Sequence, residues 1–322
     1  MKKIIKTAAA VSVGVAAGYA AKYGLWVLAD ELWFNRTKVL PKKYVTSIAD
    51  CDSSHLGDVL VDNLKWVEKY GYERHYLITD RGEKLTGFLL RAEKESNVYV
   101  FGAHGYRSYG KKEFAAVTQH YIKKGFNVFF PDHVASGESE GTYCTFSHYE
   151  TIDCLKWLDY MLDTFGKDIK IILHGVSMGA ATVMRMTGSG LLPENVKMTI
   201  EDCGFTTAVD LFRFKLEGLG IKSERPIRAV NKVNKKRLGF DFYELNPVES
   251  VKKATIPMMF IHGDSDGLVP SFMVHELYDA CASEEKKILK IDGADHAQSL
   301  MVGGEEYFNA LDEFVDKNLG RN

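Results

Sequence analysis

The chain has 322 residues, of which 46% are hydrophobic, and its formal net charge is −2. This length can bury a large core, either in one α/β domain with an insertion or in two small domains. The nearly neutral charge gives no indication of nucleic-acid binding. Five cysteines are scattered without C-x-x-C spacing, so we expect free, mostly buried thiols and neither a disulfide framework nor a zinc site (Cys51, Cys144, Cys154, Cys203, Cys281).

Residues 1–34 are predicted to form a hydrophobic N-terminal segment. A basic start, Met1–Lys6, precedes an apolar run that extends to Ala29 and is interrupted by Lys22. The run is long enough to span a bilayer only if Lys22 reaches one interface. We expect a single-pass anchor with the remainder outside the cytoplasm, so that the protein is a membrane protein. A cleaved signal peptide, giving a secreted protein, and an amphipathic helix packed on a cytoplasmic protein are the alternatives.

The remainder of the chain alternates between strand and helix patterns. Residues 35–71 are predicted to be a helical linker, and residues 72–322 to be one folded domain. The domain begins with two strands joined by the turn Asp80–Glu83. Further strands are expected at 98–101, 127–130, 171–174, 197–201, 256–261 and 287–291, with helices at 112–124, 149–165, 272–282 and 305–319. This order predicts an α/β fold with a mostly parallel sheet, covered by helices on both faces and led by an antiparallel hairpin.

The most informative stretch is Ile171–Thr182, which contains Gly-Val-Ser-Met-Gly. A short apolar strand ends there and small residues open a helix, so the pattern predicts a sharp strand–turn–helix with Ser177 at its apex. Gly175 and Gly179 lie where a side chain would collide with neighbouring backbone. The helix N-terminus below Ser177 offers unpaired N–H groups to an anion. Ser177 is therefore the candidate nucleophile.

A serine hydroxyl needs a base and an orienting carboxylate, because it is a poor nucleophile near neutral pH. Two later strands end in suitable residues. His262–Pro270 presents carboxylates in a turn, and Gly293–Ala297 presents a histidine. In this topology the acid and the histidine follow the serine in that order, each at the carboxyl edge of the sheet.

From Tyr72 to Leu319 the chain resembles the α/β-hydrolase superfamily, through Gly-x-Ser-x-Gly, His-Gly-x-x-Asp-x-x-Val-Pro and Gly-x-x-His-Ala. The resemblance implies a catalytic triad of Ser177, Asp266 and His296. It also implies that the oxyanion hole consists of the backbone N–H groups of Met178 and Tyr106. A single His-Gly precedes Tyr106, unlike the triple-glycine run of some lipases and esterases. The resemblance implies no metal and no organic cofactor.

Several other polar residues compete for a catalytic role. Asp264 is the nearest rival to Asp266, but a role in shaping the turn is the simpler interpretation. Asp202 follows the preceding strand, where some similar hydrolases carry their acid. We interpret His104 as support for its loop, and His133 as structural, although similar hydrolases usually have an arginine–glycine pair at that turn. Core or strand-end positions are expected for three further residues, His174, Cys154 and His262.

Residues 205–246 interrupt the alternation of strands and helices where this superfamily carries its cap. Val209–Leu219 is amphipathic, and its apolar side is expected to close over Ser177 and line the substrate pocket. A basic run follows, from Arg225 to Arg237. A solvated outer face is the ordinary interpretation of this run, and contact with anionic headgroups or an acidic substrate is the alternative.

The sequence therefore predicts a serine hydrolase that cleaves a small carboxylic ester through an acyl-enzyme. Peptidase, thioesterase or acyltransferase activity would use the same residues, and fold alone does not choose among them. The details most resemble serine aminopeptidase-like hydrolases, including N-terminally anchored bacterial ones. A membrane-tethered binding protein without turnover is the alternative from another class.

Overall fold

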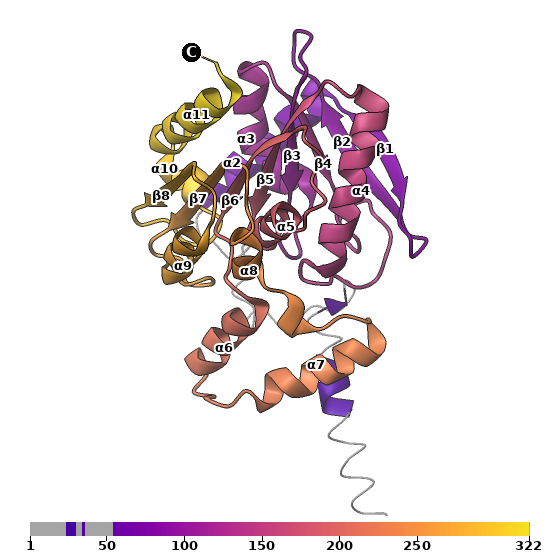
Figure 1. The fold of residues 1–322 in the computed structure, drawn as a ribbon, viewed down its shortest axis with the longest axis vertical. Helices are drawn as coiled ribbons and strands as arrows, with labels where there is room; N and C mark the ends of the chain where they lie inside the picture. The colour runs from indigo at the N-terminus through magenta and orange to yellow at the C-terminus, as the bar shows by residue number, and fades with distance from the viewer. Residues whose placement is uncertain (1–23, 30–33, 36–53, 322) are drawn as a thin grey trace, which may run out of the picture.

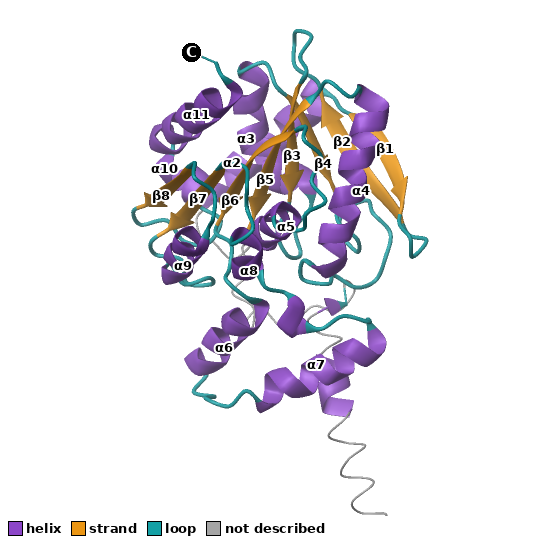
Figure 2. Cartoon of the chain, in the orientation of Figure 1, coloured by secondary structure: helices purple, strands orange, loops and turns teal. Residues whose placement is uncertain are grey.

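A computed structural model of the chain describes residues 24–29, 34–35 and 54–321. Its centre is an eight-stranded sheet with the order β1-β2-β4-β3-β5-β6-β7-β8 (Figures 1 and 2). The first two strands pair with each other, and β2 with β4, in antiparallel fashion; every later pair is parallel. The strands are β1 (Glu73–Ile78), β2 (Lys84–Leu90), β3 (Val98–Ala103), β4 (Asn127–Pro131), β5 (Lys170–Val176), β6 (Val196–Asp202), β7 (Met258–Gly263) and β8 (Lys286–Ile291). The predicted fold class, with its leading hairpin, is confirmed.

Helices cover both faces of the sheet because successive strand residues point to opposite sides. Val98 and Val100 of β3 pack under α2, α3 and α11, whereas Tyr99 and Phe101 pack under α4 and α5. Beyond α5, two more helices, α8 and α9, extend the second layer over β7. The helices of the two layers are α2 (Ser54–Tyr70), α3 (Gly110–Lys123), α4 (His148–Phe165), α5 (Met178–Thr187), α8 (Pro247–Val251), α9 (Phe272–Ala280), α10 (Ser299–Gly303) and α11 (Glu305–Leu319).

The cap is formed by α6 (Ala208–Gly218), α7 (Arg225–Arg237) and the short 3-10 helix η3 (Phe242–Glu244), all between β6 and β7. It lies beyond the carboxyl ends of the parallel strands, at the bottom of Figure 1. Its interior is aromatic: Phe240 and Phe242 contact each other and also the ring of Phe34, which comes from far earlier in the chain. The backbone of Phe34 is fixed as well, because its carbonyl accepts a hydrogen bond from the Cys144 N–H at 2.9 Å.

The N-terminal segments of the prediction are only partly within the described residues. Most of residues 1–34 lies outside them, and so does most of the predicted linker up to position 53. No helix in the part of the chain that the structure describes is long and apolar enough to cross a membrane. The helical part of the linker, α2, packs against α3 and buries Val67 completely, so α2 is part of the folded body.

Candidate active site

The turn between β5 and α5 holds Ser177 in a strained conformation. Its φ is 57° and its ψ is −116°, a combination that costs energy for any residue with a Cβ. The glycines around it allow close packing: a Cβ on Gly179 would lie 1.8 Å from the carbonyl oxygen of Ala103, and one on Gly175 would lie 2.2 Å from that of Gly179. The Ser177 N–H donates to the carbonyl of Asp202 at 2.8 Å. Together these contacts fix the serine at the carboxyl edge of the sheet.

Three side chains from separate loops meet at this edge. His296 Nε2 is 2.8 Å from Ser177 Oγ, and His296 Nδ1 is 2.7 Å from Asp266 Oδ2. A carboxylate only accepts hydrogen bonds, so the Nδ1 of a neutral His296 carries the proton and its Nε2 accepts from the serine hydroxyl. All three residues are at most 7% exposed. The structure thus brings together the three residues named in the sequence analysis, in a geometry that can move a proton from Ser177 to His296.

Asp266 is anchored by more than His296. Its Oδ1 accepts from the N–H groups of Leu268 and Val269, both at 2.8 Å. His262 Nε2 lies 3.3 Å from Oδ2 and 3.0 Å from the carbonyl oxygen of Val269. Burial alone would raise the pKa of Asp266, but the hydrogen bonds from His262 and His296 outweigh it and hold that pKa below its ordinary range. The carboxylate is therefore ionised and fixed in direction.

His262 contacts the site, and the sequence interpretation missed this contact. The sequence analysis expects a core or strand-end position, and His262 does lie near the end of β7, but its ring also contacts Asp266. The signal was its spacing, four residues before Asp266 across a turn that folds back on β7. Burial would lower the pKa of His262, but the carboxylate beside it raises the pKa above the ordinary value.

The two rival acids lie elsewhere. Asp202 Oδ1 accepts from Ser299 Oγ at 3.0 Å, and burial raises the pKa of Asp202 to about 6. Asp264 is on the surface, where its Oδ1 accepts from the N–H of Gly293 at 2.8 Å and so ties the turn after β7 to the histidine loop. Each carboxylate thus has a partner of its own, and the contact with His296 is made by Asp266.

The loop after β3 contacts the serine from the other side. A Cβ on Gly105 would be 3.3 Å from Ser177 Cβ, so the backbone before Tyr106 passes directly over the turn. Met178 is the first residue of α5, and its N–H therefore has no acceptor within the helix. The Tyr106 ring contacts Phe146 with a centroid distance of 5.6 Å, and its burial raises the pKa of its hydroxyl. The proposed oxyanion donors thus lie on two segments that flank Ser177.

His104 and His133 support this loop. His104 Nε2 accepts from the N–H of His133 at 2.9 Å, and its Nδ1 donates to the carbonyl of Gly105 at 2.8 Å. The centroids of the two rings are 4.2 Å apart with their planes tilted by 42°, and burial lowers both pKa values. His174 is also buried, between the hydroxyls of Tyr121 and Tyr307. These histidines are neutral parts of the core.

A cavity of about 160 Å³ opens beside His296, and Ser177 is not among the residues that line it. The lining residues come from α2, α3, α10, α11, the loop after β8 and the ends of β5 and β6. The cap packs its aromatic cluster on Met178 and Ala181 at the start of α5. The expectation that the apolar side of the cap closes over Ser177 and lines the substrate pocket stays a prediction.

One group of potential metal ligands occurs among the described residues, and it overlaps this site. Cys203, Asp266 and His296 lie within 4.8 Å of one another. Burial and the neighbouring carboxylates raise the pKa of the Cys203 thiol well above its usual value, and a neutral thiol is a poor ligand. Asp266 and His296 already use the facing atoms on each other. The donor set suits proton transfer better than metal binding.

Comparison with known proteins agrees with this geometry. A family model described as alpha/beta hydrolase fold matches residues 102–245. The solved structure of the esterase Pf2001 from Pyrococcus furiosus has a TM-score of 0.62 and 22% identity, over 77% of this chain and 92% of that one. The chain therefore has the α/β-hydrolase fold. The fold that the sequence resemblance implied is confirmed.

The curated relatives of this chain are distant in sequence. Caffeoylshikimate esterase of Arabidopsis thaliana is 24% identical over 76% of this chain and 83% of its own length. A Saccharomyces cerevisiae relative, named an uncharacterized membrane protein, is 22% identical over 76% of this chain and 79% of its own length. The chain spans 64% of the length of the uncharacterized Bacillus subtilis protein YqkD, with 25% identity over 61% of this chain.

Proposed function

We propose that this chain is a serine hydrolase that cleaves carboxylic esters through an acyl-enzyme. The observation that carries the proposal is the continuous hydrogen-bonded chain from Ser177 through His296 to Asp266, with distances of 2.8 and 2.7 Å. His296 takes the hydroxyl proton as Ser177 attacks the ester carbonyl, and Asp266 keeps the imidazole in the required tautomer. His296 then returns the proton to the departing alcohol.

The negative charge on the carbonyl oxygen needs donors that are already in place. In the proposal these are the backbone N–H groups of Met178 and Tyr106, which the turn and the Gly105 loop hold on two sides of Ser177. Water, deprotonated by His296, then attacks the acyl-enzyme and releases the acid. Loss of one such donor typically reduces the rate on the order of a hundredfold or more.

Ester cleavage is favoured over related acyl transfers by the names of two similar proteins. Pf2001 is described as an esterase, and the Arabidopsis relative as caffeoylshikimate esterase. A panel of p-nitrophenyl esters of increasing acyl length, measured beside aminoacyl amides and thioesters, tests the substrate class. We expect the highest kcat/KM on an ester. A preference for amides would instead make the chain a peptidase.

Labelling with a fluorophosphonate probe tests the nucleophile. We expect wild-type protein to be labelled and Ser177→Ala to be neither labelled nor active, while Ser265→Ala, in an exposed turn nearby, keeps both properties. Folded wild-type protein that shows no Ser177-dependent labelling would favour a binding protein without turnover.

We also propose that the protein is bound to a membrane through its N-terminal apolar run, Thr7–Ala29. The run has the length of a bilayer span when Lys22 lies at an interface. Cell fractionation tests this proposal: we expect the full chain to stay in the membrane pellet after washing with carbonate and with high salt. Release by either wash would show that the run does not span.

A further inference from the structure

The outer side of the cap carries an unusual concentration of positive charge. Residues 205–246 include nine Lys or Arg and five Asp or Glu, a net charge of +4 in a chain whose total is −2. In α7 the exposed positions are cationic and recur at helical spacing, whereas the opposite face, with Ile227 and Val233, is buried in the cap (Arg225, Arg228, Lys232, Lys235, Lys236). The helix thus presents a basic stripe, residues 225–236, on its exposed side.

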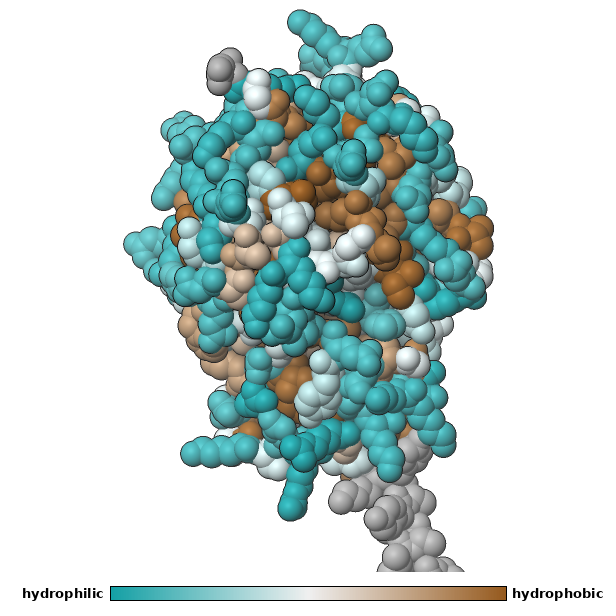
Figure 3. All heavy atoms as spheres, viewed as in Figure 1, coloured by the Kyte–Doolittle hydropathy of each residue, from teal (hydrophilic) through white to brown (hydrophobic). Residues whose placement is uncertain are grey.

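Apolar side chains accompany the stripe. The turn from α6 to α7 exposes Leu219 and Ile221, the former to 73%, and Lys222 follows directly. Six of the thirteen large hydrophobic side chains that are exposed in the described residues lie in the cap or in residues 24–29 (Leu25, Leu28, Phe214, Leu219, Ile221, Tyr243). Figure 3 shows the outer cap as largely hydrophilic, with some hydrophobic residues between the hydrophilic ones. A mixture of cations and exposed apolar side chains is typical of surfaces that lie in a lipid headgroup layer.

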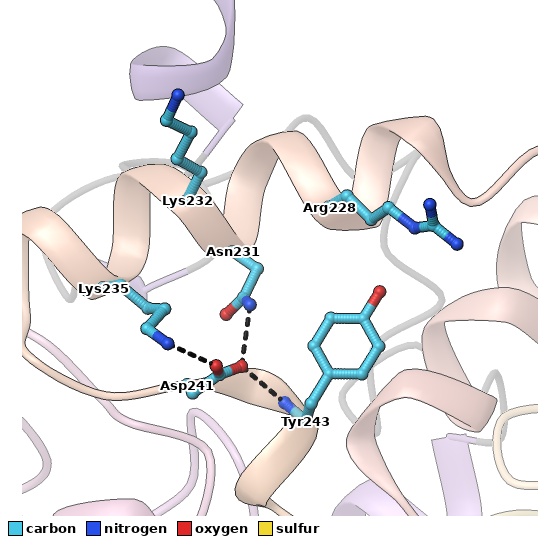
Figure 4. A pocket seen from close by; sticks show the side chains of 6 residues that line it. All are labelled: Arg228, Asn231, Lys232, Lys235, Asp241 and Tyr243. Carbon is cyan, nitrogen blue, oxygen red and sulfur yellow. Dashed lines mark hydrogen bonds and ion pairs between the residues drawn. The ribbon is translucent and has the colours of Figure 1, made fainter.

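A shallow hollow of about 470 Å³ lies along the stripe (Figure 4). It is lined by Arg228, Asn231, Lys232, Lys235, Asp241 and Tyr243. Lys235 and Asn231 hold Asp241 at 2.6 and 2.7 Å, so this carboxylate is already neutralised, while Lys232 points away from it. Glu224, directly before α7, is likewise held by Arg213 and Arg228. The positive charge that remains suits a phosphate or carboxylate group of a lipid.

The described part of the N-terminal apolar run, residues 24–29, lies at the same end of the molecule. Phe34 is fixed inside the cap, 5.2 Å from Phe242 between ring centroids. Figures 1 and 4 draw the short helix of residues 24–29 beside α7. The chain therefore enters the body at the cap, and a membrane that held residues 24–29 would be adjacent to the basic stripe.

We propose that the outer face of the cap, the basic stripe together with Leu219 and Ile221, docks on an anionic lipid surface. The proposal goes beyond the hydrolase function, because neither Ser177 nor turnover enters it. It also differs from the N-terminal anchor, since it depends on lipid charge and the anchor does not. Each Lys or Arg close to an anionic bilayer contributes about 1 kcal/mol, which is about fivefold in partitioning.

Flotation of the full chain with vesicles tests the proposal. Binding is compared between phosphatidylcholine vesicles with and without phosphatidylserine. The difference is the binding that depends on lipid charge, and binding through residues 1–29 is common to both. The test variant replaces Lys222, Arg225 and Lys232 by Gln, which leaves the ion pairs of Glu224 and Asp241 in place. The control replaces Lys94, Lys167 and Lys253 by Gln. These lysines precede β3, β5 and β7, at the end of the sheet opposite the cap. Their substitution removes the same number of positive charges as the cap variant does.

We expect phosphatidylserine to increase the binding of wild type and control on the order of tenfold or more, salt to reverse the increase, and the cap variant to lose most of it. A wild type indifferent to phosphatidylserine, or equal losses in both variants, would overturn the proposal. Where neutral vesicles already bind all the protein, an environment-sensitive dye on Ser223→Cys, in a Cys51→Ser background, reports contact directly. A dye that responds only to protein concentration would identify a contact between copies of the chain and would also overturn it.

Discussion

The site around Ser177 and the cap beyond it are built from opposite kinds of contact. At the site, charged and polar side chains are buried, and each is fixed by backbone groups: Asp266 by two N–H groups, and Ser177 by the carbonyl of Asp202. In the cap, the interior is aromatic and the charges are on the outside, in ion pairs such as Arg213 with Glu224. Buried polar groups tolerate little change, whereas surface pairs contribute little to stability. The two regions should therefore respond very differently to similar substitutions.

The largest effect is expected at the orienting acid. Asp266→Asn keeps the shape but offers His296 an amide in place of a carboxylate, which destabilises the reactive tautomer and the imidazolium. We expect kcat on p-nitrophenyl esters to fall on the order of 10⁴-fold with little change in KM. The matched control is Asp202→Asn, which alters a buried carboxylate bonded to Ser299. If the control lost as much activity as Asp266→Asn while remaining folded, the acid would be assigned to the wrong residue.

A second large effect is expected from adding one carbon beside the serine. Gly179→Ala places a Cβ 1.8 Å from the carbonyl oxygen of Ala103, and backbone must move to relieve the clash. We expect the free energy of unfolding to fall by about 3 kcal/mol or more. In the cap, Gly220→Ala meets open space and strains only its φ of +77°, so a loss of about 1 kcal/mol is expected. Urea denaturation of both variants measures the contrast, and equal losses would show that the turn can relax.

The same contrast explains which features could be predicted from the sequence. The turn at Ser177, the carboxylate and the histidine each lie in a short motif whose local geometry is fixed by neighbours in the chain. The strands were predictable too, because buried parallel strands are continuous apolar runs, such as Val98–Phe101.

Features that depend on packing between distant segments were not predictable. Phe34 packs with Phe240 and Phe242 across some two hundred positions of the chain, which no local pattern encodes. The packing of α2 on α3, which makes this helix a wall of the cavity beside His296, is another example. His262 lies between these cases: its spacing from Asp266 was visible, but its contact required the turn to fold back on β7.

An intermediate effect is expected from a buried carboxyl behind the site. Burial raises the pKa of Glu201 to about 8, whereas the same group in the unfolded chain titrates near its ordinary 4.5. Between these values the unfolded state releases a proton that the folded state retains, so stability falls as pH rises through this window. Glu201→Gln removes the titration and can keep the hydrogen bond from the Gly204 N–H. We expect the difference in free energy of unfolding, variant minus wild type, to be larger at pH 8 than at pH 5 by on the order of 1–3 kcal/mol. Urea denaturation at both values measures this difference, and parallel profiles would contradict a raised pKa.

The smallest effect is expected in the cap's own ion pairs. Arg213 bonds Glu224 at 2.5 Å and also contacts Asp210, but its side chain is 40% exposed, so water and salt screen both interactions. Arg213→Gln should therefore change the free energy of unfolding by less than about 1 kcal/mol, and raised salt should reduce even that difference. A loss comparable to that of Gly179→Ala would mean that the ion pairs, and not the aromatic interior, hold the cap together. The contrast between a buried polar site and a screened outer surface would then fail, because the charges of the cap would be structural and not available to a partner.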